Sequence, residues 1–259
     1  NNSGVGIQAS DNSNGNLIQA NTVTGNGTDG VYINGSSDNT ILGNVIERNS
    51  SASDRGVGVQ IFGGTNTRNR VLSNQILSNG TDGVFINSSS GNAIGQAGQG
   101  NVISGNRRVG VQIFGGRAMV GASNNVVQGN RITDNGLDGV ALNSASGNTV
   151  GDNVIMGNRS GVNILGSRAT GNSVGNSVLG NVIRGNKSFD VALQPPVIGN
   201  VIGGPLGEAN DLSKPVAVYA GGQSRNRIGR NMRGHSGAGS VGPHRSTPET
   251  GLRQRHKVR

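Results

Sequence analysis

The chain has 259 residues, a formal net charge of +9 and no cysteine. Only 32% of its residues are hydrophobic and 2% are aromatic. The lack of cysteine excludes a disulfide framework, and the lack of any run of about eighteen apolar residues excludes a membrane-spanning helix.

An asparagine repeat runs through most of the chain, with the template Asn-x-(Val/Ile/Leu)-x-x-Asn-x-(Val/Ile)-x-x-Asn. Clear copies begin at Asn39, Asn69, Asn125 and Asn148. A short apolar segment of the form Gly-Val-x-(Ile/Leu) lies between copies. Counted from Gly4 to Gly161, these segments recur at spacings of 26, 28, 25, 27, 29 and 22 residues, and Asp190 and Pro215 continue the series without a glycine. The repeat predicts about nine stacked units that share one core.

Each unit contains three short runs with apolar residues at alternate positions, which predicts strands. In the second unit these runs contain Val31 and Ile33, then Ile41, then Ile46. The abundant Gly and Asn favour tight turns between the runs. The predicted fold class is therefore all-β, a single-stranded parallel β-helix of about nine rungs. Each strand would pair with its equivalent in the next rung, about 4.8 Å away.

Equivalent apolar positions are expected to stack into three interior columns. The first contains Val23, Ile46, Ile76, Ile103, Ile132, Ile155 and Ile183. The second contains Ile18, Ile41, Val71, Ile94, Val127, Val150 and Val174. The third contains Val31, Val59, Val84, Val111, Val140 and Val162. The asparagines at the strand-to-turn boundaries are expected to adopt unusual backbone dihedrals and to hydrogen-bond from rung to rung as ladders.

Charged residues of alternating sign are expected near one turn in successive rungs. They are Asp29, Arg55, Asp82, Arg108, Asp138 and Arg159. Opposite charges in adjacent strands attract, although exposed pairs of this kind contribute little individually.

The positive charge is concentrated at the C-terminal end. Residues 1–224 carry 13 Lys/Arg against 12 Asp/Glu, whereas residues 225–259 carry 9 against 1. We therefore expect a β-helix over residues 1–233 and a basic, disordered tail over residues 234–259. The tail is a candidate for binding an anionic surface. Because the sequence starts within a rung, we also expect a fragment or processed product whose open ends could self-associate.

The Gly-Asn-x-Ile-x-x-Asn and Asp-Gly-Val-x-Ile motifs, over about residues 4–233, resemble right-handed parallel β-helix repeats of the pectate lyase-like superfamily. The repeats are similar to those of mannuronan epimerases and of the periplasmic accessory protein for the copper site of nitrous oxide reductase. The resemblance implies a right-handed coil. For the lyases of this fold it also implies calcium bound by clustered carboxylates.

The catalytic signatures of those relatives do not occur in this sequence. Neither Asp-Pro-His-(Asp/Glu) nor Gly-His-Gly is present, and His235, His244 and His256 all lie in the tail. Successive aspartates of the charged series would stand two rungs apart, about 9–10 Å by strand spacing, which is too far to share one ion. No copper site is supported, because Cys is absent and the Met residues are isolated. No cofactor is therefore expected, with calcium retained only under a lyase alternative.

The outward positions of the Gly-Val-x-Ile strands supply the candidate substrate-binding residues. They are Tyr32, Gln60, Phe85, Gln112 and Asn163. Aromatic rings could stack on sugar rings while amides hydrogen-bond their hydroxyl groups. In the alternative, Tyr32 and Phe85 pack under turns or against a neighbouring domain. Phe62 and Phe114 are expected to form a separate stack at the next turn.

These observations favour a non-catalytic extracellular or cell-envelope β-helix module that acts as a scaffold or as a polysaccharide-binding surface. Two alternatives remain open: a uronide-acting polysaccharide lyase or epimerase fragment, and an oligomerising or partner-docking solenoid. No catalytic residue is assigned.

Overall fold

A computed structural model describes residues 2–50, 56–64, 66–116, 121–166, 173–219 and 225–233. Strands dominate these residues, and the helical element found among them is the short 3-10 turn η1 (Leu206–Glu208). Within the same ranges, no helix is long and apolar enough to cross a membrane. The predicted tail, residues 234–259, lies outside the described residues.

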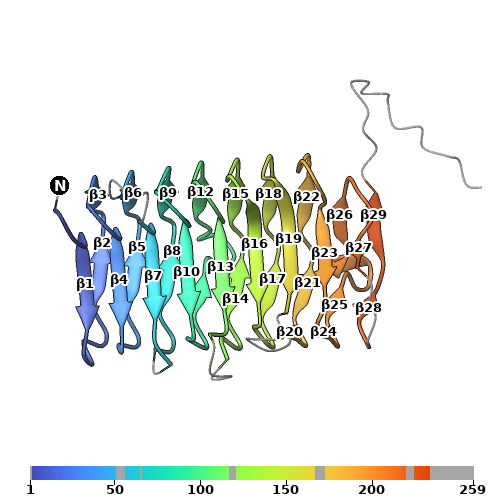
Figure 1. Cartoon of the computed structure of the whole chain (residues 1–259), viewed down its shortest axis with the longest axis horizontal. Helices are drawn as coiled ribbons and strands as arrows, with labels where there is room; N and C mark the ends of the chain where they lie inside the picture. The colour runs from blue at the N-terminus through green and yellow to red at the C-terminus, as the bar shows by residue number, and fades with distance from the viewer. Residues whose placement is uncertain are drawn as a thin grey trace, which may run out of the picture.

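The chain coils so that each turn adds one strand to each of three long sheets (Figure 1). Sheet 1 contains β1 (Ile7–Ser10), β4 (Val31–Asn34), β7 (Val59–Phe62), β10 (Val84–Asn87), β13 (Val111–Phe114), β16 (Asp138–Asn143), β19 (Ser160–Leu165), β23 (Val191–Gln194) and β27 (Ala217–Val218). Sheet 2 contains β2 (Leu17–Gln19), β5 (Thr40–Leu42), β8 (Arg70–Leu72), β11 (Ala93–Ile94), β14 (Val126–Gln128), β17 (Thr149–Gly151), β21 (Ser177–Leu179), β25 (Val201–Ile202) and β28 (Arg227–Ile228).

The third sheet closes the coil. Sheet 3 contains β3 (Thr22–Thr24), β6 (Val45–Glu47), β9 (Gln75–Leu77), β12 (Val102–Ser104), β15 (Arg131–Thr133), β18 (Val154–Met156), β22 (Val182–Arg184), β26 (Asn210–Leu212) and β29 (Asn231–Arg233). A small two-stranded sheet pairs β20 (Ser173–Val174) with β24 (Val197–Ile198). With nine strands in each long sheet of the described part, the predicted all-β parallel β-helix of about nine rungs is confirmed.

The interior columns follow the predicted alternation, because the inward residue of each strand registers with its equivalent in the next rung. Val84, for example, lies between Val59 and Val111, and all three are fully buried. One predicted member is wrong. Val150 pairs with Val178, not with Val174, whose side chain is 40% exposed on β20.

The first rung also differs from its predicted register. Ile7 pairs with Val31, so the counterpart of Gly30 is Gly6 and not Gly4. A Cβ on Gly6 would lie 2.6 Å from Val23 Cγ1, whereas a Cβ on Gly4 would meet nothing within 4 Å. Close packing against the core therefore distinguishes the structural glycine from a neighbouring one.

Three ladders of asparagines, most of them buried, bond successive rungs together, as predicted. The first contains Asn16, Asn39, Asn69, Asn92, Asn125, Asn148, Asn176, Asn200 and Asn226. The second contains Asn21, Asn44, Asn74, Asn101, Asn130, Asn153, Asn181, Asn210 and Asn231. The third contains Asn26, Asn49, Asn79, Asn106, Asn135, Asn158 and Asn186.

Asn130 shows how one ladder member is satisfied. Its Oδ1 accepts hydrogen bonds from the backbone N–H and the Nδ2 of Asn101, at 2.9 and 2.8 Å. Its Nδ2 donates to Asn153 Oδ1 at 3.0 Å and to the carbonyl of Ile94 at 2.7 Å. The amide thus links three rungs. Its hydrogen bonds to the protein replace those to water and so offset the cost of burying this polar group.

The expectation of unusual dihedrals at the ladder asparagines is wrong. At most ladder positions a positive φ falls on the residue that precedes the asparagine, as at Gly129 (φ 69°) and Asp152 (φ 53°). The preceding residue makes the bend, and the asparagine that follows is free to direct its amide inward.

We expect Asn130→Ala to lower the free energy of unfolding by at least about 3 kcal/mol, because it leaves two buried donors of Asn101 without their acceptor. Urea unfolding followed by circular dichroism measures the change. Asn34→Ala is the matched control, since Asn34 is half-buried on the outer side of β4 and outside the ladders. Equal effects of the two substitutions would contradict a dominant role for the ladders.

Glycine at the start of most sheet 1 strands has a steric cause. A Cβ on Gly110 would lie 2.5 Å from Ile132 Cγ2, 2.6 Å from the carbonyl oxygen of Gly139 and 2.9 Å from Asn135 Nδ2.

We expect Gly110→Ala to destabilise the fold by about 1–3 kcal/mol or more through overpacking. Thermal unfolding measures the loss, with Gly4→Ala as the control. A variant at residue 110 as stable as this control would show that the core accommodates the extra methyl group.

Candidate functional site

The outer side of sheet 1 carries a regular pattern of aromatic and amide side chains on β4, β7, β10 and β13. In each strand the first and third residues are buried, while the second and fourth reach the surface. We call these outward side chains the ring-and-amide face. Its members are Tyr32, Asn34, Gln60, Phe62, Phe85, Asn87, Gln112 and Phe114.

The aromatic rings of this face alternate between two parallel columns. Strand register places Tyr32 beside Gln60 and Gln60 beside Phe85 in one column. Phe62 and Phe114 stand in the other column, where Asn87 lies between them. Each of the four rungs therefore presents one ring and one amide, and the ring changes sides at every rung.

The expected separate stack of Phe62 and Phe114 at the next turn is therefore wrong. Phe62 lies on the same face as Tyr32, with 6.5 Å between the ring centroids and an angle of 31° between the ring planes. Its side chain is among the exposed large hydrophobic groups, at 39% exposure. The alternation in Val-Gln-Ile-Phe already places Gln60 and Phe62 on one side of the strand. This signal could have placed the phenylalanine pair on the same face as the candidate substrate-binding residues.

The pattern ends after β13. The column that contains Gln112 continues through Ala141, Asn163 and Ala192, whose exposed fractions are only 4%, 7% and 0%. The Nδ2 of Asn163 donates to Asp138 Oδ2 at 3.1 Å, and its Oδ1 accepts from Gln194 Nε2 at 3.0 Å. The structure thus brings four of the five candidate binding residues onto an accessible face and places Asn163 within a buried polar network.

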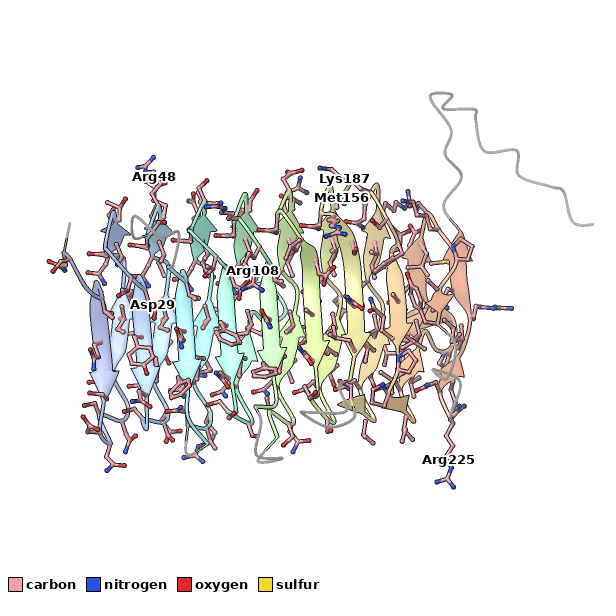
Figure 2. The ribbon with its side chains drawn as sticks, in the orientation of Figure 1. Asp29, Arg48, Arg108, Met156, Lys187 and Arg225 are labelled. Atoms are coloured by element: carbon pink, nitrogen blue, oxygen red, sulfur yellow. The ribbon has the colours of Figure 1, made fainter. Side chains whose placement is uncertain are left out.

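Carboxylates of every second rung lie at the start of the sheet 1 strands. Asp29 Oδ1 accepts the backbone N–H of Val57, and Asp82 Oδ1 accepts that of Val109, both at 3.0 Å. Figure 2 shows Asp29 and Arg108 near these strand starts, whereas Arg48 and Lys187 lie at the turns that follow sheet 3. The aspartates therefore complete the backbone hydrogen bonding of the next rung.

Burial raises the pKa of Asp29, Asp82 and Asp138 above the ordinary value of 3.8. For Asp82 the backbone N–H of Val109 and the charge of Arg108 lower the pKa, but burial outweighs them. The charge of Arg159 acts on Asp138 in the same way. The predicted proximity of opposite charges is thus found at Arg108 and Arg159, while Arg55 lies outside the described residues.

The described ranges contain no group of three or more His, Cys, Asp or Glu side chains that could hold a metal ion. The three predicted tail histidines lie outside those ranges. Among the described residues the aspartates are separated by the intervening rungs, so they do not form the converging carboxylates that calcium requires.

Comparison with known proteins assigns the class. Residues 1–97 match the family described as right handed beta helix region, and with three parallel sheets and asparagine ladders the chain is a right-handed parallel β-helix protein. Residues 58–205, more than half of the chain, match the family described as periplasmic copper-binding protein (NosD). The chain belongs to this NosD family. Among curated proteins, no sequence matches it.

Solved structures share the coil. The A-module of mannuronan C-5 epimerase AlgE4 from Azotobacter vinelandii matches with a TM-score of 0.62 and 19% identity, over 91% of this chain and 61% of that one. The periplasmic alginate epimerase AlgG matches with a TM-score of 0.57 and 17% identity, over 88% of this chain and 48% of that one. At these identities the likeness shows the fold alone. The chain spans about half the length of AlgG.

The family description implies copper, which proteins bind mainly through thiolate, thioether and imidazole ligands. The described residues do not fit such a site. They contain no Cys or His, and their two methionines, Met156 on β18 and Met232 on β29, belong to strands three rungs apart in sheet 3. No chemical step through copper is derived from these residues.

The raised pKa of Asp82 makes folding stability depend on pH. Below about pH 3.8 the carboxyl is protonated in both states and imposes no penalty. As the pH rises through the raised pKa of the folded state, the unfolded state loses its proton first, so stability falls. We expect Asp82→Asn to remove this loss, and the stability of the variant relative to the natural chain to increase with pH. Urea unfolding midpoints of the variant and the natural chain, measured between about pH 3 and 7, test this expectation. A difference between the two midpoints that does not vary with pH would contradict the burial argument.

Proposed function

We propose that the chain is a cell-envelope β-helix module that binds a polysaccharide along the ring-and-amide face. The observation that carries the proposal is the alignment of Tyr32, Phe62, Phe85 and Phe114 with amides in four consecutive rungs of one sheet. Rings present large apolar surfaces for stacking, and amides both donate and accept hydrogen bonds. Together they suit a ligand with apolar faces and hydroxyl-rich edges.

The location and the ligand class draw support from the comparisons. The NosD family and AlgG are both described as periplasmic. The structural neighbours named above act on alginate or mannuronan by their descriptions. An elongated face is suited to an extended polymer, because every rung adds one ring and one amide about 4.8 Å further along.

Binding without catalysis is favoured over a lyase or epimerase. The side chains on the ring-and-amide face are neutral apart from the weakly acidic phenol of Tyr32, so the face itself offers no general base near neutral pH. The nearby Asp29 and Asp82 are committed to backbone N–H groups of the next rung. Incubation with alginate and pectate in the presence of calcium tests the alternative, since a lyase would release unsaturated products that absorb ultraviolet light.

A glycan array followed by calorimetric titration of the best oligosaccharide tests the proposal. We expect Tyr32→Ala and Phe85→Ala each to weaken binding about tenfold, which corresponds to about 1.4 kcal/mol. Val102→Ala is the matched control, because Val102 is an exposed apolar residue on β12 of sheet 3. Binding that survives both ring substitutions unchanged would move the site away from this face.

A further inference from the structure

The rings of the ring-and-amide face change columns in a regular order from strand to strand. Going from β4 to β13, the ring lies at the second, fourth, second and fourth strand position, and the amide always takes the other one. The pattern therefore repeats every two rungs, while a ring recurs at every rung. A straight column of rings would instead repeat at every rung.

The face is also uncharged. None of its eight residues is Asp, Glu, Lys or Arg. Burial and, second to it, the charge of Asp29 raise the pKa of Tyr32, so its phenol stays uncharged near neutral pH. Arg108, near the start of β13, lies within the electrostatic reach of Asp82. A polyanionic ligand would thus meet no cation on the face itself, and at the strand starts beside it the positive charge of Arg108 is accompanied by the carboxylates of Asp29 and Asp82.

We propose that the face binds a neutral, extended β-1,4-linked glycan, with one sugar unit per rung and a repeat of two units; this inference rests on the proposed function. In such a chain each unit is turned by a half-turn relative to the one before it. The hydroxymethyl edge therefore alternates between left and right from unit to unit. The length of one unit along the chain is close to the spacing of one rung, about 4.8 Å.

The match assigns a contact to each side chain. Each ring would stack on the apolar face of one sugar, and the amide across from it would bond the hydroxyl edge on the opposite side. In the next rung both contacts exchange sides together with the sugar. An α-1,4-linked glycan curves and presents the same edge repeatedly, so it would keep this match over few units.

Exchanging two residues within β7 tests the alternation while conserving composition. The double variant Gln60→Phe/Phe62→Gln keeps four rings but places three of them in one column. We expect the double variant to bind cellohexaose about tenfold more weakly than the natural chain does. The single variant Phe62→Gln, which has one ring fewer, is expected to lose about the same affinity. An affinity equal to that of the natural chain would mean that ring number, and not ring placement, determines binding, and would overturn the inference.

The matched control is Gln8→Ser/Ser10→Gln in β1, which exchanges the equivalent outward positions of a strand without rings. We expect this exchange to leave the affinity unchanged. Circular dichroism and thermal unfolding verify that each variant folds. If the β7 exchange does not fold, the equivalent exchange Gln112→Phe/Phe114→Gln in β13 replaces it.

The ligand panel separates this inference from the proposed function. Cellohexaose and hexa-N-acetylchitohexaose are neutral and β-1,4-linked, maltohexaose is α-1,4-linked, and hexamannuronate is β-1,4-linked but acidic. We expect the first two to bind at least about tenfold more tightly than the others. Tighter binding of maltohexaose or hexamannuronate would overturn the inference and leave polysaccharide binding intact. No binding of any glycan, on the array or in titration, would overturn both.

Discussion

The hydrogen bond between asparagine amides of successive rungs is the interaction on which the rest of this structure depends. A coil of short strands has few residues per rung with which to fill a core, and its turns would otherwise bury unpaired backbone groups. Most ladder amides accept a backbone N–H of the preceding rung, and members such as Asn130 also bond a strand carbonyl. The core columns and the close glycine contacts follow from the alignment that the ladders impose.

The same constraint explains why family membership and function separate in this protein. Stacking requires particular residues at the ladder, core and glycine positions, and these residues carry much of the resemblance to other β-helix proteins. The outward positions are free to vary, so chemistry specific to this chain must be sought there. The described residues contain no Cys or His and only two widely separated methionines, while sheet 1 displays an uncharged pattern of rings and amides. The family description and the outer face therefore indicate different ligands.

Much of the fold could be predicted because the repeat appears directly in the sequence, with asparagines five residues apart and β-branched residues between them. The errors arose where two local patterns compete. Val174 and Val178 both follow an asparagine by two positions, and only the bonding of Asn176 to Asn148 and Asn200 selects Val178 for the core. At the site, Tyr32 and Phe85 were visible as one column. The burial of Asn163 depends on Asp138 and Gln194 in neighbouring rungs, which no single-rung pattern reveals.

The ladders have a direction, which gives the coil a polarity along its axis. In every rung the Nδ2 of the asparagine points to the Oδ1 of the following rung, so the amide dipoles of a ladder are parallel and add together, as peptide dipoles do in an α-helix. The third ladder ends where Asn186 Nδ2 donates to Asp190 Oδ1 at 3.2 Å. Asp190 occupies the position that glycine holds in earlier rungs, and its other oxygen accepts from the backbone N–H groups of Ser213 and Lys214. A carboxylate at the positive end of an aligned row of dipoles stabilises that row much as an acidic residue stabilises a helix N-terminus. This β-helix therefore resembles a bundle of three parallel macrodipoles, one of which is closed by an anion.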